Sequence, residues 1–137
     1  MYPAELVGPM KEQMTSKGFQ ELVNAAAVEE AMQKEGTTLL FINSVCGCSA
    51  GTARPGVLDS IQGEGKKPDF LTTSFAGFDV EGVSAARKHL LPYPPSSPAI
   101  ALLKNGELVH MIERHMIEGR SAEMISANLK SAYEMYC

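Results

Sequence analysis

The chain has 137 residues, which is enough for one compact domain and short for two. Hydrophobic residues make up 45% of the sequence, so we expect a packed core and not a disordered chain. The net charge of −4, from 12 basic and 16 acidic side chains without a basic stripe, argues against a protein that binds nucleic acid or an anionic membrane.

The N-terminal part of the chain predicts one helix followed by a short strand. Leu6, Met10 and Met14 recur every four residues, which is the spacing of the apolar stripe on an amphipathic helix. We therefore expect a helix from Ala4 to about Lys17, and after it a short edge strand over residues 19–23.

The most distinct strand is residues 37–43, Thr-Thr-Leu-Leu-Phe-Ile-Asn. It is apolar and β-branched on both faces, as in a central strand that is buried on both sides. A helix over residues 24–35, for which Asn24 is a good N-cap, precedes it. A helix over residues 50–61 follows it, and Pro55 must lie in the first turn of that helix or kink it.

The middle of the chain predicts one more strand and one more helix. Residues 69–75 read as a strand, and Asp79 is placed to cap the helix that comes next. One side of that helix carries Val80, Val83, Ala86 and Leu90. Residues 91–98 contain four prolines in eight positions, which indicates a rigid loop.

The last part of the chain predicts a hairpin and a final helix. Asn105-Gly106, between strands over 99–103 and 107–113, is a strong signal for a two-residue type I′ turn. Ser121 is a suitable N-cap for the last helix. The side chains expected to face inward there are Ile125, Leu129, Ala132 and Tyr136. The order of elements predicts a single α/β domain, residues 1–137, with a central mixed sheet flanked by helices.

The sequence suggests neither a secretory signal nor a membrane span. Its start, Met1-Tyr2-Pro3-Ala4-Glu5, has no basic segment and no apolar run, and its longest apolar stretch, near 39–42, is far too short to cross a bilayer. We therefore expect a cytoplasmic protein. In that reducing compartment, paired cysteines more often catalyse or bind metal than form structural bridges.

Cys46-Gly47-Cys48 lies between the buried strand and the next helix. A disulfide across one intervening residue closes a tight ring, which makes the bond easy to reduce, and Gly47 suits the backbone angles of such a ring. Unpaired N–H groups and the helix dipole at this junction favour a thiolate. We expect the more exposed Cys46 to be the nucleophile and Cys48 the resolving thiol.

Three further residues keep more than one interpretation. Ser44 either bonds a cysteine or caps the turn, and Arg54 either adds positive potential or points into solvent. The C-terminal Cys137 is a third redox thiol, a dimer bridge or, as we favour, an inert end.

Other functions for the cysteine pair stay open. Buried cysteines can be purely structural, and Cys-x-Cys is also a soft-metal motif, so a metal-binding or metal-delivery module is the alternative function. A zinc site needs four ligands, and His89, His110 and His115 show no ligand spacing with the cysteines.

Five segments carry a resemblance to a known family. They are 43–55, Asn-Ser-Val-Cys-Gly-Cys-Ser-Ala-Gly-Thr-Ala-Arg-Pro; 75–77, Phe-Ala-Gly; 93–98, Tyr-Pro-Pro-Ser-Ser-Pro; 106–110, Gly-Glu-Leu-Val-His; and 113–120, Glu-Arg-His-Met-Ile-Glu-Gly-Arg. In these segments the chain resembles the bacilliredoxin family, small thioredoxin-like proteins with a Cys-Gly-Cys site. The site differs from that of common thioredoxins, in which two residues separate the cysteines.

The resemblance implies a thioredoxin-like fold with an extra N-terminal helix, and reduction of mixed disulfides between protein cysteines and bacillithiol, a small bacterial thiol. Weak disulfide isomerase activity is a related expectation. Bacillithiol would be a co-substrate, and no tightly bound cofactor is expected. The partners would be oxidised or S-thiolated client proteins, and the protein would be a monomer or a weak homodimer.

The resemblance also suggests supporting residues. A cis proline faces the catalytic cysteine in thioredoxin-like folds, and Pro98, at the start of a strand, occupies the matching place. Arg114 could bind a carboxylate of the small thiol, and His115 could carry a proton near the thiols. Both residues also fit a surface ion pair.

Overall fold

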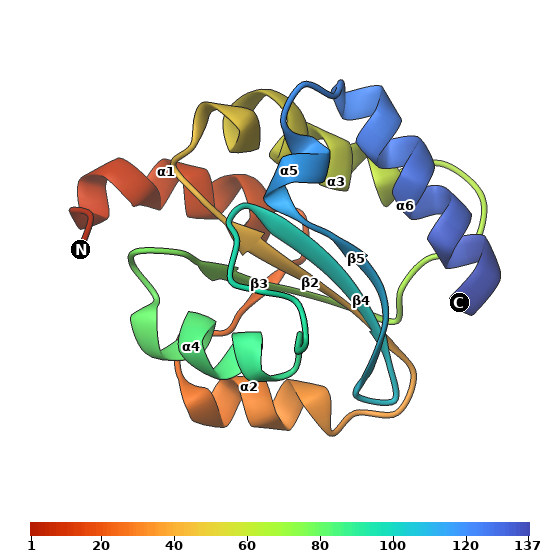
Figure 1. The fold of residues 1–137 in the computed structure, drawn as a ribbon, viewed down its shortest axis with the longest axis horizontal. Coiled ribbons are helices and arrows are strands. Elements are labelled where there is room, and N and C mark those ends of the chain that lie inside the picture. Colours follow the sequence, from red (N-terminus) through yellow and green to blue (C-terminus); the bar gives the residue numbers. More distant parts are fainter.

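The computed structural model describes residues 1–137, and a five-stranded mixed sheet lies at its centre (Figure 1). The strands are β1 (Gln20–Glu21), β2 (Thr37–Asn43), β3 (Phe70–Phe75), β4 (Ala99–Lys104) and β5 (Glu107–Ile112). Their order across the sheet is β1-β3-β2-β4-β5, and β1, β3 and β2 run parallel while β4 and β5 are antiparallel to their neighbours. The predicted mixed α/β architecture is confirmed.

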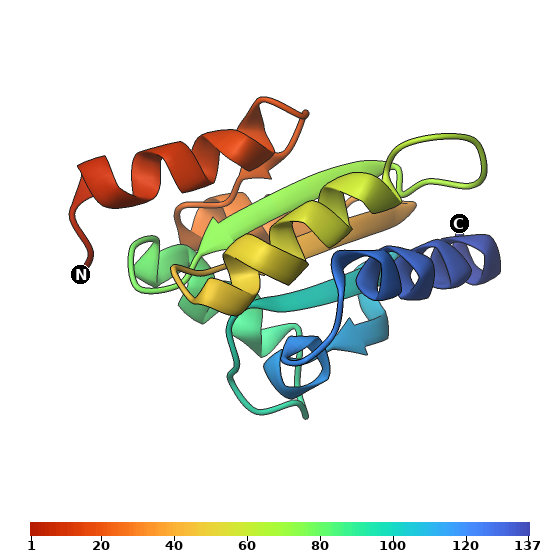
Figure 2. The same ribbon diagram turned by 90° about the horizontal axis from the view of Figure 1, so that it is seen from above.

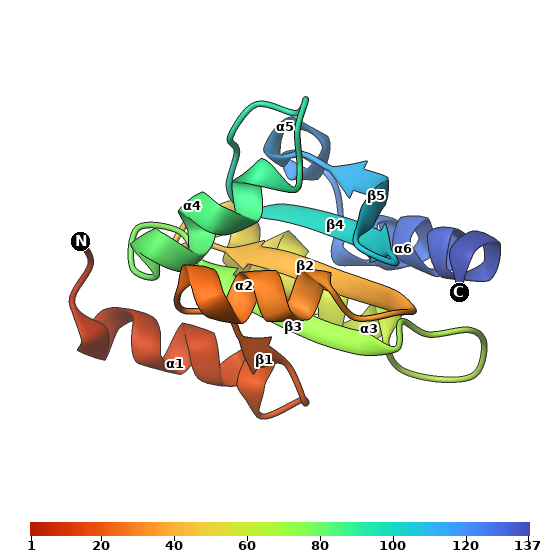
Figure 3. The ribbon, with the colours of Figure 1, turned by 90° about the horizontal axis from the view of Figure 1, so that it is seen from below.

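Helices cover both faces of this sheet. They are α1 (Ala4–Thr15), α2 (Ala25–Met32), α3 (Arg54–Ser60), α4 (Val80–Lys88), α5 (Arg114–Ile117) and α6 (Ala122–Tyr136). Helices α3 and α6 lie over one face (Figure 2), and α2 and α4 lie over the other (Figure 3). None of these helices is long and apolar enough to cross a membrane.

Strand β2 divides the hydrophobic core into two parts. All seven of its residues are buried, and alternate side chains point to opposite faces, so Leu39 and Phe41 join the core under α3 and α6 while Leu40 and Ile42 join the core under α2 and α4. The sequence prediction of a central strand buried on both sides is confirmed. This strand ends at Asn43, and the two cysteines follow directly.

Several local signals are confirmed. Asn24 and Ser121 cap α2 and α6, since their side chains accept from the backbone N–H groups of Ala27 at 2.8 Å and Met124 at 3.2 Å. Asn105 and Gly106 both have positive φ, 53° and 80°, as a type I′ turn requires. The predicted edge strand is present as β1.

The inward face of α1 differs from the prediction. Val7 and Met14 are fully buried, whereas Leu6 is 44% exposed. Lys11 lies on the inward face between Val7 and Met14, and its ammonium is 3.0 Å from Asp79. Because Lys11 is charged, a search for apolar residues at helical spacing does not assign it to the inward face.

The start of α4 also differs from the prediction. Asp79 is the N-cap residue, as predicted, but its side chain makes no capping hydrogen bond, because its carboxylate accepts the backbone N–H of Phe75 at 2.9 Å and pairs with Lys11. Val80 is 57% exposed. The other three residues of the predicted face, Val83, Ala86 and Leu90, are buried. Gly82 is buried as well, and a Cβ there would clash with the backbone oxygen of Leu22, so only glycine permits this packing.

The helix predicted over 50–61 is interrupted. Residues Ser49–Ala53 form a π-helical turn in which the N–H of Arg54 bonds the carbonyl of Ser49, and α3 begins at Arg54. Pro55, in the first turn of α3 as predicted, has no N–H to donate to the preceding turn. The prediction also missed α5, a single turn directly after β5.

Candidate active site

Cys46 and Cys48 lie in the connection from β2 to the π-helical turn. Their sulfur atoms are 2.7 Å apart, both thiols are free, and both side chains are partly exposed. The carbonyl of Cys46 accepts from the N–H groups of Ser49 at 2.9 Å and Ala50 at 3.2 Å. The loop therefore holds the two sulfurs in contact at the carboxyl end of the central strand.

The two thiols differ in acidity. The hydrogen bond that Cys48 donates has the largest effect and lowers the pKa of Cys46. Burial opposes it, and backbone N–H groups and the charge of Arg114 lower the pKa by smaller amounts. Burial raises the pKa of Cys48 to about 11, and the neighbouring Cys46 adds to this rise. The pair therefore ionises at Cys46 first. The role of Cys46 as the nucleophile stays a prediction.

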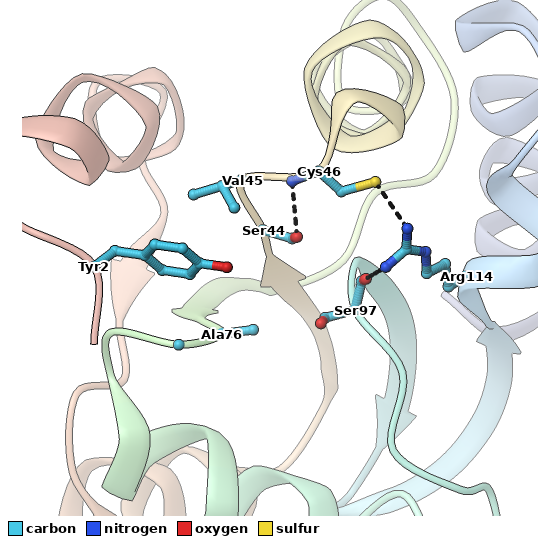
Figure 4. Close-up of a pocket in the computed structure, with 8 residues that line it drawn as sticks. Tyr2, Ser44, Val45, Cys46, Ala76, Ser97 and Arg114 are labelled. Atoms are coloured by element: carbon cyan, nitrogen blue, oxygen red, sulfur yellow. Dashed lines mark hydrogen bonds between the residues drawn. The ribbon is translucent and has the colours of Figure 1, made fainter.

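Arg114 supplies a positive charge directly at the sulfur. Its Nη2 lies 3.2 Å from Cys46 Sγ, and its Nη1 donates to the carbonyl of Ser97 at 3.3 Å (Figure 4). Glu118, one helical turn later, accepts from Nε at 3.3 Å. The short helix α5 thus places the guanidinium beside the thiol; its expected contact with a substrate carboxylate remains a prediction.

Hydrogen bonds of Ser44 and Asn43 hold the cysteine loop in place. The hydroxyl of Ser44 accepts the N–H of Cys46 at 3.0 Å, and the N–H of Ser44 donates to the Asn43 side chain at 2.8 Å. Asn43 also accepts from the Ser49 hydroxyl at 3.1 Å and donates to the carbonyl of Met10 at 3.2 Å. Asn43 is 1% exposed and connects the cysteine loop to α1.

Arg54 extends this buried network and does not touch the sulfurs. It is 3% exposed, its Nε donates to the Ser49 hydroxyl at 3.4 Å, and its Nη1 donates to Gln13 of α1. Nη2 has no partner, and burial lowers the pKa of the guanidinium. The interpretation that Arg54 points into solvent is therefore wrong, and any effect on the thiols passes through Ser49 and Asn43.

Pro98 is buried and its peptide bond with Ser97 is cis, as the resemblance implied. Ser97 lines the same cavity as Cys46, which brings the proline loop to the site. His115 does not face the thiols: its side chain is 73% exposed and its Nε2 lies 3.9 Å from Glu113. The structure thus gives no support for His115 as a proton carrier.

The remaining two predicted residues are Gly47 and Cys137. Gly47 is exposed and does not have a positive φ, and a Cβ there would meet nothing within 4 Å. Cys137 packs against the core near α6, and its N–H bonds the carbonyl of Tyr133 at 2.8 Å. The chain end is therefore held in place, and Cys137 lies apart from the cysteine pair.

A cavity of about 330 Å³ opens beside Cys46. Arg114 and Ser97 line one side, and Tyr2 lines another (Figure 4). Gly77 also lines the cavity. No group of three or more His, Cys, Asp or Glu side chains comes together anywhere in the structure to hold a metal ion. A metal would therefore find only the two thiols as protein ligands here.

Sequence reasoning missed three residues of this site: Asn43, Gln13 and Tyr2. A polar residue that ends an otherwise apolar strand was a usable signal for Asn43. Gln13 and Tyr2 come from the N-terminal segment, and nothing in the sequence connects them to cysteines so far along the chain.

Comparison with known proteins identifies relatives over the whole chain. The family model described as disulphide isomerase matches residues 2–137. A bacilliredoxin of Cytophaga hutchinsonii is 58% identical over 134 residues, covering 98% of this chain and 98% of the relative. Bacilliredoxins of Geobacillus kaustophilus and Shouchella clausii are 47% and 50% identical over 137 residues, covering 99% of this chain and 94% of each relative.

Solved structures with low sequence identity share the fold. Mitochondrial thioredoxin 3 of Saccharomyces cerevisiae matches with a TM-score of 0.59 at 17% identity, covering 90% of this chain and 98% of that chain. Fasciola hepatica thioredoxin matches with a TM-score of 0.56 at 14% identity, covering 87% of this chain and 100% of that chain. The thioredoxin-like fold is confirmed, and the chain belongs to the bacilliredoxin family of thiol–disulfide oxidoreductases.

Proposed function

We propose that this oxidoreductase reduces mixed disulfides between protein cysteines and bacillithiol. The observation that supports this most directly is the geometry at Cys46: an acidified thiol, in contact with a second thiol and a guanidinium, at the edge of a cavity. The curated relatives named bacilliredoxin support the choice of small thiol.

In the first step the Cys46 thiolate attacks the sulfur of bacillithiol in the mixed disulfide. The Cys46–bacillithiol bond forms as the bond to the client cysteine breaks, and the client leaves as a thiolate that takes a proton from water. The client is reduced, and Cys46 carries the small thiol. Arg114 stabilises the attacking anion before the transfer.

In the second step Cys48 attacks the Cys46 sulfur and releases bacillithiol, or a free small thiol attacks the bound bacillithiol sulfur, which releases Cys46 as a thiolate and forms a disulfide of the two small thiols. Attack by Cys48 leaves a Cys46–Cys48 disulfide, which a further thiol reductant must then reduce. The neighbouring Cys46 contributes to the raised pKa of Cys48, and that contribution ends when Cys46 is bonded to bacillithiol. Burial of Cys48 remains, so its thiol stays less ionised than that of an ordinary cysteine.

Isomerase activity would use the same first step on a disulfide between two client cysteines. The description of the matching family supports including this as a secondary activity. We propose S-thiolated and oxidised proteins as partners, in the cytoplasm.

Mass spectrometry of variants that each lack one cysteine tests the proposal. A purified client protein carrying bacillithiol on one cysteine is mixed with Cys48→Ala, Cys46→Ala or the control Cys137→Ala. We expect the adduct on Cys46 in Cys48→Ala, no reduction of the client by Cys46→Ala, and activity like that of the unaltered protein in Cys137→Ala. An adduct on Cys48, with client reduction retained in Cys46→Ala, would falsify the assignment of roles.

A further inference from the structure

We propose that Tyr2 is a specificity-determining residue that binds the small-thiol half of the substrate at the end remote from its sulfur. The inference rests on the proposed function and narrows its substrate class. It assigns to the site an anionic small thiol that extends from Cys46 across the cavity to the Tyr2 ring and offers a hydrogen-bonding group there.

The position of Tyr2 is fixed by the backbone around it. Its N–H donates to the carbonyl of Gly77 at 3.2 Å, and Pro3 continues the chain in an extended conformation before α1 begins. The ring lies so close over Gly77 that a Cβ at that position would be 2.5 Å from a ring carbon. The Tyr2 side chain therefore has a defined position, although it lies near the chain end.

The hydroxyl of Tyr2 is left for a ligand. The side chain is 40% exposed, and its hydroxyl makes no hydrogen bond to the other cavity residues drawn in Figure 4. In Figure 4 the ring extends into the cavity, with the hydroxyl at its inner end. The buried Tyr133 shows the usual alternative, since its hydroxyl lies 2.9 Å from that of Ser60.

The charges of the cavity select the sign of the occupant. Arg114 is the only cation that lines the cavity, and no Asp or Glu lines it. Glu118 bonds Nε of Arg114 from outside the cavity, and the negative charge of Cys46 disappears when its sulfur is bonded to the small thiol. The volume of about 330 Å³ is also roughly that of ten liquid water molecules, far more than a two-carbon thiol would fill. An anionic small thiol with a polar end beyond its sulfur matches both features.

Steady-state kinetics of Tyr2→Ala and Tyr2→Phe test the inference. One client protein is prepared with bacillithiol, with glutathione, or with the neutral hydroxyethyl thiol on the same cysteine. For the bacillithiol adduct we expect KM to rise about tenfold in Tyr2→Ala and a few-fold in Tyr2→Phe, with kcat unchanged, because ground-state binding is lost. For the hydroxyethyl adduct, which is too short to reach the ring, we expect no change.

Two controls separate binding from effects on folding or on the thiol. Tyr93→Ala removes a tyrosine of nearly equal exposure, 39%, that does not line the cavity, and should behave like the unaltered protein. The pH profile of Cys46 alkylation should be the same in all Tyr2 variants, whereas a merely structural role would shift it.

The outcomes distinguish the inference from the proposed function. If the unaltered protein reduces the bacillithiol adduct and Tyr2→Ala reduces it equally well, the inference is overturned and the proposed function stands. If Tyr2→Ala loses activity on the bacillithiol and hydroxyethyl adducts equally, Tyr2 acts structurally and the inference is also overturned. If the unaltered protein reduces none of the adducts, the proposed function fails, and the inference that rests on it fails too.

Discussion

A single proton held between two sulfurs gives Cys46 and Cys48 their different chemistry. With Cys46 as the anion, Cys48 donates to it, which lowers the pKa of one thiol and raises that of the other. Identical side chains two positions apart thus acquire separate roles because one is more buried and the other faces Arg114. Thiol–disulfide exchange with two cysteines requires this difference in acidity, since the attacking sulfur must be ionised before the resolving sulfur reacts.

Replacing Arg114 with Ala should slow alkylation of Cys46 at neutral pH by a few-fold. The guanidinium lies 3.2 Å from the sulfur, and losing its charge raises the pKa of Cys46. The arginine is exposed to solvent, so the effect should shrink as ionic strength rises. Iodoacetamide rates measured against pH, at low and high salt, give both the midpoint and its salt dependence.

The matched control for this prediction is Arg120→Ala, which makes the same change of net charge at an exposed position with no contact to the thiols. Arg114→Lys should recover part of the rate, because a lysine keeps the charge but not the planar fork. Equal rates in Arg114→Ala and Arg120→Ala would show that the contact does not acidify the thiol.

The cysteine pair could be predicted from sequence, because three cysteines in the chain leave few interpretations for two that flank a glycine. The function of Arg114 at the sulfur could not, because it depends on α5, a single turn too short for any periodicity to show. Arg54 was recognised as a charge near the motif, but whether it faces solvent or the buried network is decided by the packing of α1.

At the scale of elements, helix α1 supports the cysteine loop through hydrogen bonds from two of its residues. Its Met10 carbonyl accepts from Asn43, and its Gln13 side chain accepts from Arg54. Asn43 and Arg54 meet at the Ser49 hydroxyl, directly after the cysteines. The network joins α1, β2 and the π-helical turn into one unit, so the N-terminal helix is part of the site and not only a cover for the sheet edge.

Replacing Asn43 with Ala should lower the free energy of unfolding by about 3 kcal/mol and slow alkylation of Cys46. The change removes the acceptor of the buried Ser44 N–H and of the Ser49 hydroxyl proton, and the donor to the Met10 carbonyl, and a buried polar group left without its partner costs about 1–3 kcal/mol before the structure relaxes. Urea unfolding at neutral pH measures the first effect, and iodoacetamide rates measure the second.

Asn24→Ala is the natural comparison, since it is the same substitution at an exposed helix cap with one hydrogen bond. It should cost about 1 kcal/mol and leave the alkylation rate unchanged. If both variants lost equal stability and kept equal reactivity, the network around Asn43 would have no special part in holding the loop.

The elements that sequence predicted well depend on local chemistry. The Asn105-Gly106 turn needs two positive φ angles, the caps of α2 and α6 need one side-chain oxygen each, and β2 needs only a run of apolar residues. The errors arose where tertiary contacts decide. Lys11 faces inward because Asp79 is there, and α4 turns Gly82 toward β1 because only glycine allows that approach. No local pattern carries this information.

At the scale of the whole molecule, the acidity of Cys46 links folding to redox state. The interactions with Cys48 and Arg114 exist in the folded dithiol and are lost both on unfolding and on oxidation. Whatever they add to the stability of the folded dithiol they also add to the oxidising power of the disulfide, because a stabilised reduced form makes its disulfide a stronger oxidant. The same contacts therefore affect both the stability of the folded dithiol and the oxidising power of the disulfide.

The stability advantage of the reduced protein over the oxidised protein should depend on pH with a maximum near pH 9. Cys46 has a folded pKa below its ordinary value of 9.0, so its contribution is present above pH 9 and is lost as the pH falls through the folded value. Cys48 has a folded pKa of about 11, so its contribution is present below pH 9 and is lost between pH 9 and 11. The difference between the two redox forms should thus rise toward pH 9 and decline above it. Urea unfolding of both forms across this range measures it, and groups other than these two cysteines largely cancel in the difference. Arg114→Ala should flatten the rising part, and a difference that does not vary with pH in the unaltered protein would mean that folding does not separate the acidities of the two sulfurs.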